Sequence, residues 1–136
     1  MKLNKDHNTV PKLDATSYTD EVFGISQRIV ISHFSKKSDL VPEIDKNYVF
    51  DEATTLSIIM GFKYNKRVLV QGLHGTGKSS HIEQIAARLN WPCLRINLDG
   101  HISRFDLLGK DAIILKEEKQ ITTFKQGLLQ WSIENP

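Results

Sequence analysis

A glycine-rich stretch constrains this chain more than any other feature. The pattern Gly-x-x-x-x-Gly-Lys-Ser runs from Gly72 to Ser79, which is the spacing of a phosphate-binding loop. Gly72, Gly75 and Gly77 lack the Cβ atom that restricts backbone angles, so consecutive N–H groups can turn inward around an anion. The sequence therefore predicts a loop that binds phosphate through its backbone.

Two side chains of this loop have predicted roles of their own. Lys78 is expected to reach the β- and γ-phosphates, and the hydroxyl of Ser79 is expected to ligate Mg²⁺. The helix that follows would add the positive end of its dipole. ATP and Mg²⁺ are thus the predicted cofactors, and Lys78 is the single catalytic candidate. The predicted nucleotide-binding residues are Gly72, Leu73, His74, Gly75, Thr76, Gly77, Lys78, Ser79 and Ser80.

The segments on both sides of the loop predict an α/β fold. The apolar run 68–70 is typical of a strand that is covered on both faces. After the loop, apolar residues recur at helical spacing, at Ile82, Ile85, Ala86 and Leu89. Asn90-Trp91-Pro92 ends this pattern, and 93–98 reads as a second strand. Strand, helix and strand together predict a right-handed, parallel βαβ unit.

The part of the chain before the loop predicts an arm and a helix. Residues 1–19 are polar and are expected to be mobile. The segment 22–47 mixes apolar and charged residues and is expected to form an extended arm on the rest of the protein. We therefore divide the chain into a partly disordered arm, 1–46, and a domain, 47–136. Asp51 is expected to cap a helix with an apolar side formed by Leu56, Ile59, Met60 and Phe62.

The C-terminal part predicts a hairpin and a further helix. The runs 111–115 and 120–124 are rich in apolar residues and are joined by the charged segment 116–119. From Gly127 onward the pattern fits a short amphipathic helix that ends before Pro136.

Composition argues against several classes of partner. A net charge of +2 with dispersed Lys and Arg residues gives no reason to expect nucleic acid or an anionic membrane. No apolar segment is long enough to span a bilayer, and the N-terminus turns polar where a signal peptide would turn apolar. The single cysteine, Cys93, lies in an apolar run, which favours a buried thiol in a reducing compartment. We expect a cytoplasmic protein.

Other polar residues are weaker candidates for a site. Asp99, His101 and Asp106 could hold a metal, but one imidazole and two spread carboxylates are a poor ligand set. His7 and His33 have no partner at ligand spacing, and the basic pair 66–67 is expected to lie in a solvated connection.

A wider set of segments resembles the small ATPase subunits of aerobic cobaltochelatases, a family of AAA+ ATPases in the MoxR-like branch. These segments are 41–45, 48–51, 54–56, 72–79, 81–93, 101–104 and 109–113. The resemblance covers roughly Val22 to Pro136, and His81 to Cys93 (HIEQIAARLNWPC) is its most specific part.

The resemblance implies a motor subunit that couples ATP hydrolysis to insertion of Co²⁺ into hydrogenobyrinic acid a,c-diamide in cobalamin synthesis. Such a subunit works with a large tetrapyrrole-binding subunit and an integrin-domain subunit, and it forms a homo-oligomeric ring when complete. Residues 72–79 would be its Walker A motif. The hairpin 111–124 would be the insertion in the second AAA+ helix.

The resemblance also implies parts that lie beyond residue 136. These are the Walker B Asp-Glu pair, the sensor, arginine-finger and lid residues, and two strands that separate the segments 68–70 and 93–98 in the AAA+ sheet. We therefore expect the chain to bind nucleotide better than it hydrolyses it, and its two strands either to pair directly or to leave open edges. Two alternatives stay open: another MoxR-like chaperone for metal insertion or assembly, and a nucleotide-binding module without turnover.

Overall fold

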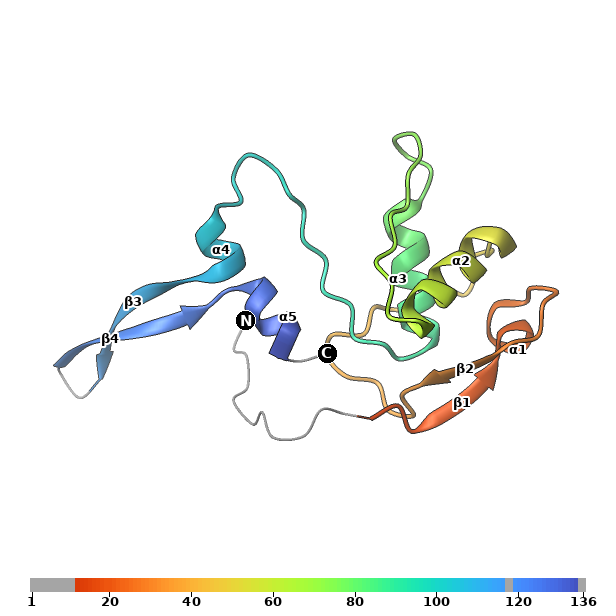
Figure 1. Cartoon of the computed structure of the whole chain (residues 1–136), viewed down its shortest axis with the longest axis horizontal. Coiled ribbons are helices and arrows are strands. Elements are labelled where there is room, and N and C mark those ends of the chain that lie inside the picture. The colour runs from red at the N-terminus through yellow and green to blue at the C-terminus, as the bar shows by residue number, and fades with distance from the viewer. Residues whose placement is uncertain (1–11, 117–118, 135–136) are drawn as a thin grey trace. The chain divides into compact units, whose positions relative to one another are not determined.

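The computed structural model describes residues 12–116 and 119–134. They form a mixed α/β structure with two compact units (Figure 1). We call residues 12–94 the N-terminal unit and the described residues from Arg95 onward the C-terminal unit.

The N-terminal unit contains one small sheet and three helices. Its elements are β1 (Ala15–Tyr18), α1 (Thr19–Phe23), β2 (Val30–His33), α2 (Glu52–Lys63) and α3 (Lys78–Arg88). β1 and β2 pair in antiparallel register, from Ala15 opposite His33 to Tyr18 opposite Val30.

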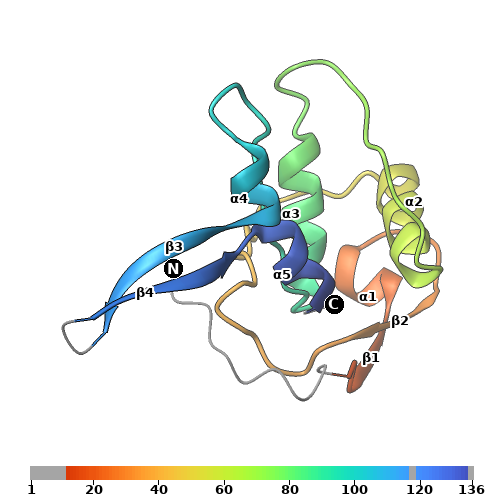
Figure 2. The same ribbon diagram turned by 60° about the vertical axis from the view of Figure 1, so that its left-hand side comes forward.

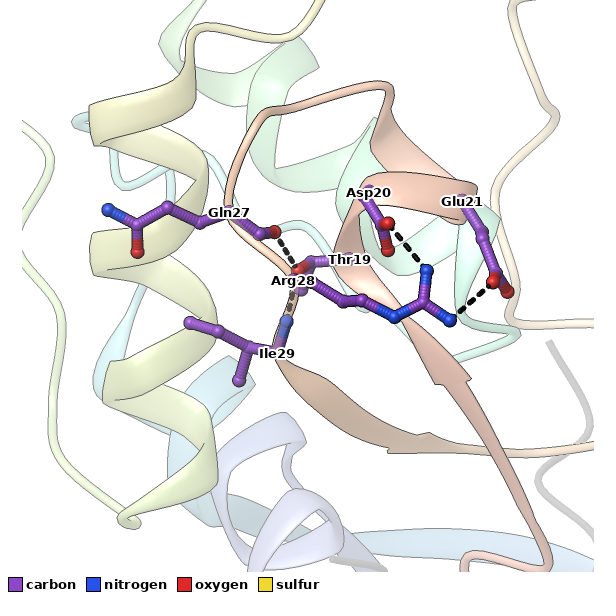
Figure 3. A network of polar contacts seen from close by, with 6 residues as sticks. All are labelled: Thr19, Asp20, Glu21, Gln27, Arg28 and Ile29. Carbon is purple, nitrogen blue, oxygen red and sulfur yellow. Dashed lines mark hydrogen bonds and ion pairs between the residues drawn. The ribbon is translucent and has the colours of Figure 1, made fainter.

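Thr19 fixes the connection between β1 and β2, and Figure 3 shows its contacts. This residue is fully buried. Its hydroxyl donates to the Gln27 carbonyl at 2.5 Å and accepts from the Ile29 N–H at 2.9 Å. Beside it, Arg28 forms ion pairs with Asp20 and Glu21 at 2.7 and 2.9 Å. These ion pairs are largely exposed, so they contribute little stability compared with the buried hydroxyl.

Residues 1–19 were expected to be mobile, but the last residues of this segment have regular secondary structure. Residues 15–19 belong to β1 and to the start of α1. The polar composition was misleading because the segment gains sheet hydrogen bonds with β2, which lies about a dozen residues further along the chain. Residues 1–11 lie outside the described part of the chain.

The core of the N-terminal unit joins the predicted arm to α2 and α3. Its buried apolar residues are Phe23, Ile25, Ile31, Ile58, Ile59, Ile85 and Leu89. The helical stripe predicted for α3 is confirmed, since Ile85 and Leu89 are 0% exposed. The arm does lie on the rest of the unit, but it contributes three of the seven core residues rather than only covering them.

The start of α2 agrees with its prediction, and its buried face agrees in part. Asp51 caps the helix by accepting the Thr54 N–H at 2.8 Å. The buried residues are Thr55, Ile58 and Ile59, while Phe62 of the predicted apolar side stays 48% exposed. The apolar side was therefore predicted only in part: Ile59 is buried and Leu56 packs against the core as expected, but Thr55 and Ile58 were not foreseen. The Thr55 hydroxyl hydrogen-bonds to His81 of α3, which places a polar residue in the interior.

The parallel βαβ unit is not confirmed. Residues 68–70 and 93–98 form no strand, and both sheets among the described residues are two-stranded and antiparallel. Leu69, expected to be buried, is 89% exposed. A strand is stable only when a neighbouring strand hydrogen-bonds to its backbone groups. The apolar pattern of a segment does not specify such a neighbour, and neither segment has one in the described residues.

The C-terminal unit is built around the predicted hairpin. It contains α4 (Arg104–Leu108), β3 (Gly109–Lys116), β4 (Lys119–Gln126) and α5 (Leu128–Glu134). The hairpin and the last helix are confirmed. α4 was not predicted, although Ser103 and Asp106 form a capping box at its start. Gly127 is required between β4 and α5, because a Cβ there would lie 2.4 Å from the Leu107 carbonyl oxygen.

We predict that Ile85→Val destabilises the N-terminal unit by about 0.5–1.5 kcal/mol, since it removes one methylene from a fully buried site. Ile44→Val is the matched control, because Ile44 is 47% exposed. Urea unfolding of both variants checks this. Equal destabilisation by the two substitutions would contradict the assigned core.

Candidate nucleotide site

The glycine-rich loop lies beyond the N-terminal end of α3 (Figures 1 and 2). α3 begins at Lys78, and Gly77 is its N-cap with φ of 77°. Gly75 has φ of 80°. Both angles lie in the left-handed region that favours glycine, so two of the three predicted loop glycines have the conformation that makes them necessary.

Lys78 folds back across the loop. Its ammonium group donates to the Leu73 carbonyl at 2.5 Å and lies 3.4 Å from the Thr76 hydroxyl. The Thr76 hydroxyl donates to the same carbonyl at 2.9 Å. A Cβ at Gly72 would lie 3.3 Å from the Thr76 oxygen. The structure therefore brings Gly72, Leu73, Thr76 and Lys78 together, and an arriving phosphate would compete with the Leu73 carbonyl for the ammonium group.

The other predicted site residues lie in or beside the same loop. His74, Gly75, Gly77, Ser79 and Ser80 are exposed. These residues therefore lie at the surface, where a ligand could reach the loop.

A second set of polar residues on α3 was not predicted. Gln84 is 9% exposed; its side chain accepts from the Asp45 N–H at 2.9 Å and donates to the Glu43 carbonyl at 3.0 Å. Arg88 donates to the Asp45 carbonyl at 2.9 Å. These bonds hold the end of the arm along α3. The signal in the sequence was a run of polar residues at helical spacing, His81, Gln84 and Arg88, beside the apolar stripe.

His81 completes this set one turn after Lys78. It is 7% exposed, with Nδ1 2.9 Å from the Tyr48 hydroxyl and Nε2 2.9 Å from the Thr55 hydroxyl. The ring lies edge-on to Tyr48 and Phe50, with centroids 5.7 and 5.6 Å away. Burial lowers the pKa of His81, and the carboxylate of Asp51 offsets part of this effect.

The weaker candidates are not gathered into a metal site. Asp106 is engaged with Ser103 in the capping box, while Asp99 lies beside His101, with their side-chain atoms 3.6 Å apart. Within residues 12–116 and 119–134, no group of three His, Cys, Asp or Glu residues could hold a metal ion.

The remaining candidates from the sequence are two histidines and the basic pair 66–67. His33 hydrogen-bonds to Ser17 at 2.9 Å, and His7 is outside the described residues. Lys66 and Arg67 are exposed and line a cleft of about 450 Å³ with Ile58, Phe62, Asn65, Val68 and Ile82. In the part of the chain that the structure describes, no helix has the length and apolar character needed to cross a membrane.

A known protein is similar in sequence to nearly the whole of this chain. Over 134 residues the chain is 52% identical to the aerobic cobaltochelatase subunit CobS of Sinorhizobium sp. Over these residues, the chain belongs to the CobS family. The match covers 98% of this chain and 40% of the relative, so the loop, α3 and the hairpin all lie within it. No family model and no solved structure matches this CobS-family chain.

We predict that the stability of this CobS-family chain falls as the pH drops through about 6.5. The pKa of buried His81 lies below its ordinary value of 6.5, so the unfolded chain binds the proton more readily. The stabilisation is complete above pH 6.5 and is lost progressively below it. Urea unfolding between pH 8 and 5 measures this dependence.

The variant His81→Asn should flatten this pH dependence. His101→Asn is the control, because the His101 side chain is 97% exposed, and it should leave the wild-type curve unchanged. A wild-type stability that stays constant down to pH 5 would show that the neutral form of His81 is not favoured by folding.

Proposed function

We propose that this chain is the nucleotide-binding part of a cobaltochelatase ATPase subunit. The observation that supports this best is the loop itself: two left-handed glycines and a lysine at the start of α3, within a region 52% identical to a cobaltochelatase subunit. Backbone amides at a helix start and a nearby ammonium group are a suitable set for the phosphates of ATP.

The proposed chemistry divides among the loop residues. Residues 72–77 would bind the phosphates through their N–H groups, and Lys78 would exchange the Leu73 carbonyl for a phosphate oxygen. Ser79 would offer its hydroxyl to the Mg²⁺ that accompanies ATP. The metal neutralises phosphate charge when it is bound.

The function proposed for the complete protein follows from the resemblance to cobaltochelatase ATPase subunits. It would couple ATP hydrolysis to insertion of Co²⁺ into hydrogenobyrinic acid a,c-diamide during cobalamin synthesis, which makes it part of a ligase that forms nitrogen–metal bonds. Its partners would be a tetrapyrrole-binding subunit and an integrin-domain subunit, and its own copies would form a ring. Cobalt is the substrate of this reaction rather than a resident metal of this chain.

We also propose that residues 68–70 and 93–98 become strands of an AAA+ sheet in the complete protein. Residues 68–70 precede the phosphate-binding loop and residues 93–98 follow α3, which is the order expected of the two strands of a βαβ unit. Both segments lack a strand partner in the described residues. The strands that would pair with these segments, and the residues that position the attacking water, would come from the part of the complete protein that follows residue 136. A nucleotide-binding module without turnover is the second candidate, and the incomplete sheet favours it for this chain taken alone.

We predict that Lys78→Ala weakens binding of Mg-ATP by about 1.5–3 kcal/mol, the range for a hydrogen bond to a charged group, or about 10- to 150-fold. Isothermal titration calorimetry measures this change. Lys66→Ala is the control, because Lys66 is an exposed residue outside the loop. Unchanged affinity in Lys78→Ala, or an equal loss in Lys66→Ala, would reject the loop as the binding site.

We predict that the 136-residue chain binds Mg-ATP without sustained hydrolysis, because the water-positioning carboxylates are expected beyond it. A phosphate-release assay at saturating Mg-ATP checks this. Sustained turnover that disappears in Lys78→Ala would contradict the expectation and would place the complete catalytic machinery within these residues.

A further inference from the structure

A largely buried chain of hydrogen bonds joins the first turn of α3 to the segments that precede it. His81 lies 2.9 Å from the Tyr48 hydroxyl on one side and 2.9 Å from the Thr55 hydroxyl on the other. Thr55 is 0% exposed, and its hydroxyl also lies 2.6 Å from the Asp51 carbonyl oxygen. Three parts of the unit therefore meet at one imidazole.

The donors and acceptors of this chain can be assigned. A hydroxyl has one hydrogen, and Thr55 donates it to the Asp51 carbonyl. Thr55 must then accept from the Nε2–H of His81. A neutral imidazole carries only one N–H, so Nδ1 accepts from the Tyr48 hydroxyl. The chain runs from Tyr48 through His81 and Thr55 to a main-chain carbonyl, and each polar hydrogen in it is used.

The first turn of α3 lacks the local support that α2 has. α2 is capped by the Asp51 side chain, whereas the N-cap of α3 is Gly77, which has no side-chain acceptor. The N–H of His81 donates to the Gly77 carbonyl at 2.8 Å. His81 therefore closes the first turn with its main chain and attaches that turn to α2 and to Tyr48 with its side chain.

We infer that Tyr48, His81 and Thr55 are positioning residues for the phosphate-binding loop. They hold in place the turn that carries Lys78 and Ser79, and they do not contact the nucleotide. A turn that is already ordered loses less conformational entropy when phosphate binds. This inference rests on the proposed function, because it concerns the same loop.

The N-terminal unit supplies a matched pair of residues for the test. Thr55 and Thr19 are both 0% exposed. Each hydroxyl donates to a main-chain carbonyl and accepts one hydrogen bond: Thr55 accepts from His81, and Thr19 accepts from the Ile29 N–H. Replacing either residue by Val keeps the shape and removes the same number of hydrogen bonds.

The experiment measures Mg-ATP affinity by calorimetry, with all variants folded at the temperature used. Thr55→Val and Thr19→Val should lower the unfolding temperature similarly. Only Thr55→Val should weaken Mg-ATP binding, by about three- to tenfold, as expected when the one hydrogen bond that joins α2 to His81 is lost. Thr55→Ser, which keeps the hydroxyl, should restore the affinity. Should Thr55→Val not fold, Tyr48→Phe carries the same expectation from the other end of the chain.

Other outcomes overturn the inference. Wild-type affinity in Thr55→Val, together with lost affinity in Lys78→Ala, would overturn the positioning role and leave the proposed function standing. An equal loss in Thr19→Val would show an effect of general stability only. If the wild-type chain binds no Mg-ATP, the proposed function and the inference both fall.

A spectroscopic measurement tests the assigned direction separately from ATP. The ¹⁵N shifts of the His81 ring at pH 8 should show hydrogen on Nε2 and none on Nδ1. The opposite tautomer would contradict the hydrogen-bond chain even if the affinities behaved as expected.

Discussion

The N-terminal unit depends on how α3 is held, and two kinds of contact hold it. Ile85 and Leu89 are completely buried and pack α3 into the core, but apolar burial is non-directional and tolerates small shifts of a helix. Hydrogen bonds from His81 and Gln84 to the end of the arm and to α2 are directional. The apolar contacts therefore stabilise α3, while the polar contacts define its position and that of the loop before it.

The loop is exposed and has few internal contacts, unlike α3, which is held by the core. Its residues are exposed, and its main internal contact joins Lys78 to the Leu73 carbonyl. Glycines at positive φ allow this path without strain. A binding loop of this kind exchanges one internal hydrogen bond for several bonds to an anion. A fixed helix and an adaptable loop together suit the proposed phosphate binding at the start of α3 better than either feature would alone.

Sequence patterns predicted the elements whose causes are local. α2 and α3 follow from a cap and from helical periodicity, and the hairpin follows from two apolar runs around a charged tip. The segments 68–70 and 93–98 failed as strands because a strand needs a partner, which local patterns do not supply. β1 was missed for the related reason that its stability comes from β2. In the site, the loop was read from its glycines and Lys78, but His81 was passed over because a polar residue on a helix usually faces solvent.

The proposed function requires the start of α3 to bind a nucleotide through its backbone amides. The most direct measurement is a titration of the ¹⁵N-labelled chain with Mg-ATP, followed by amide chemical shifts in NMR spectra. We expect the largest changes at Gly75, Gly77, Lys78 and Ser79, with small changes in β3 and β4. Saturable changes confined to other segments, with the amides of these four residues unmoved, would contradict the proposed function.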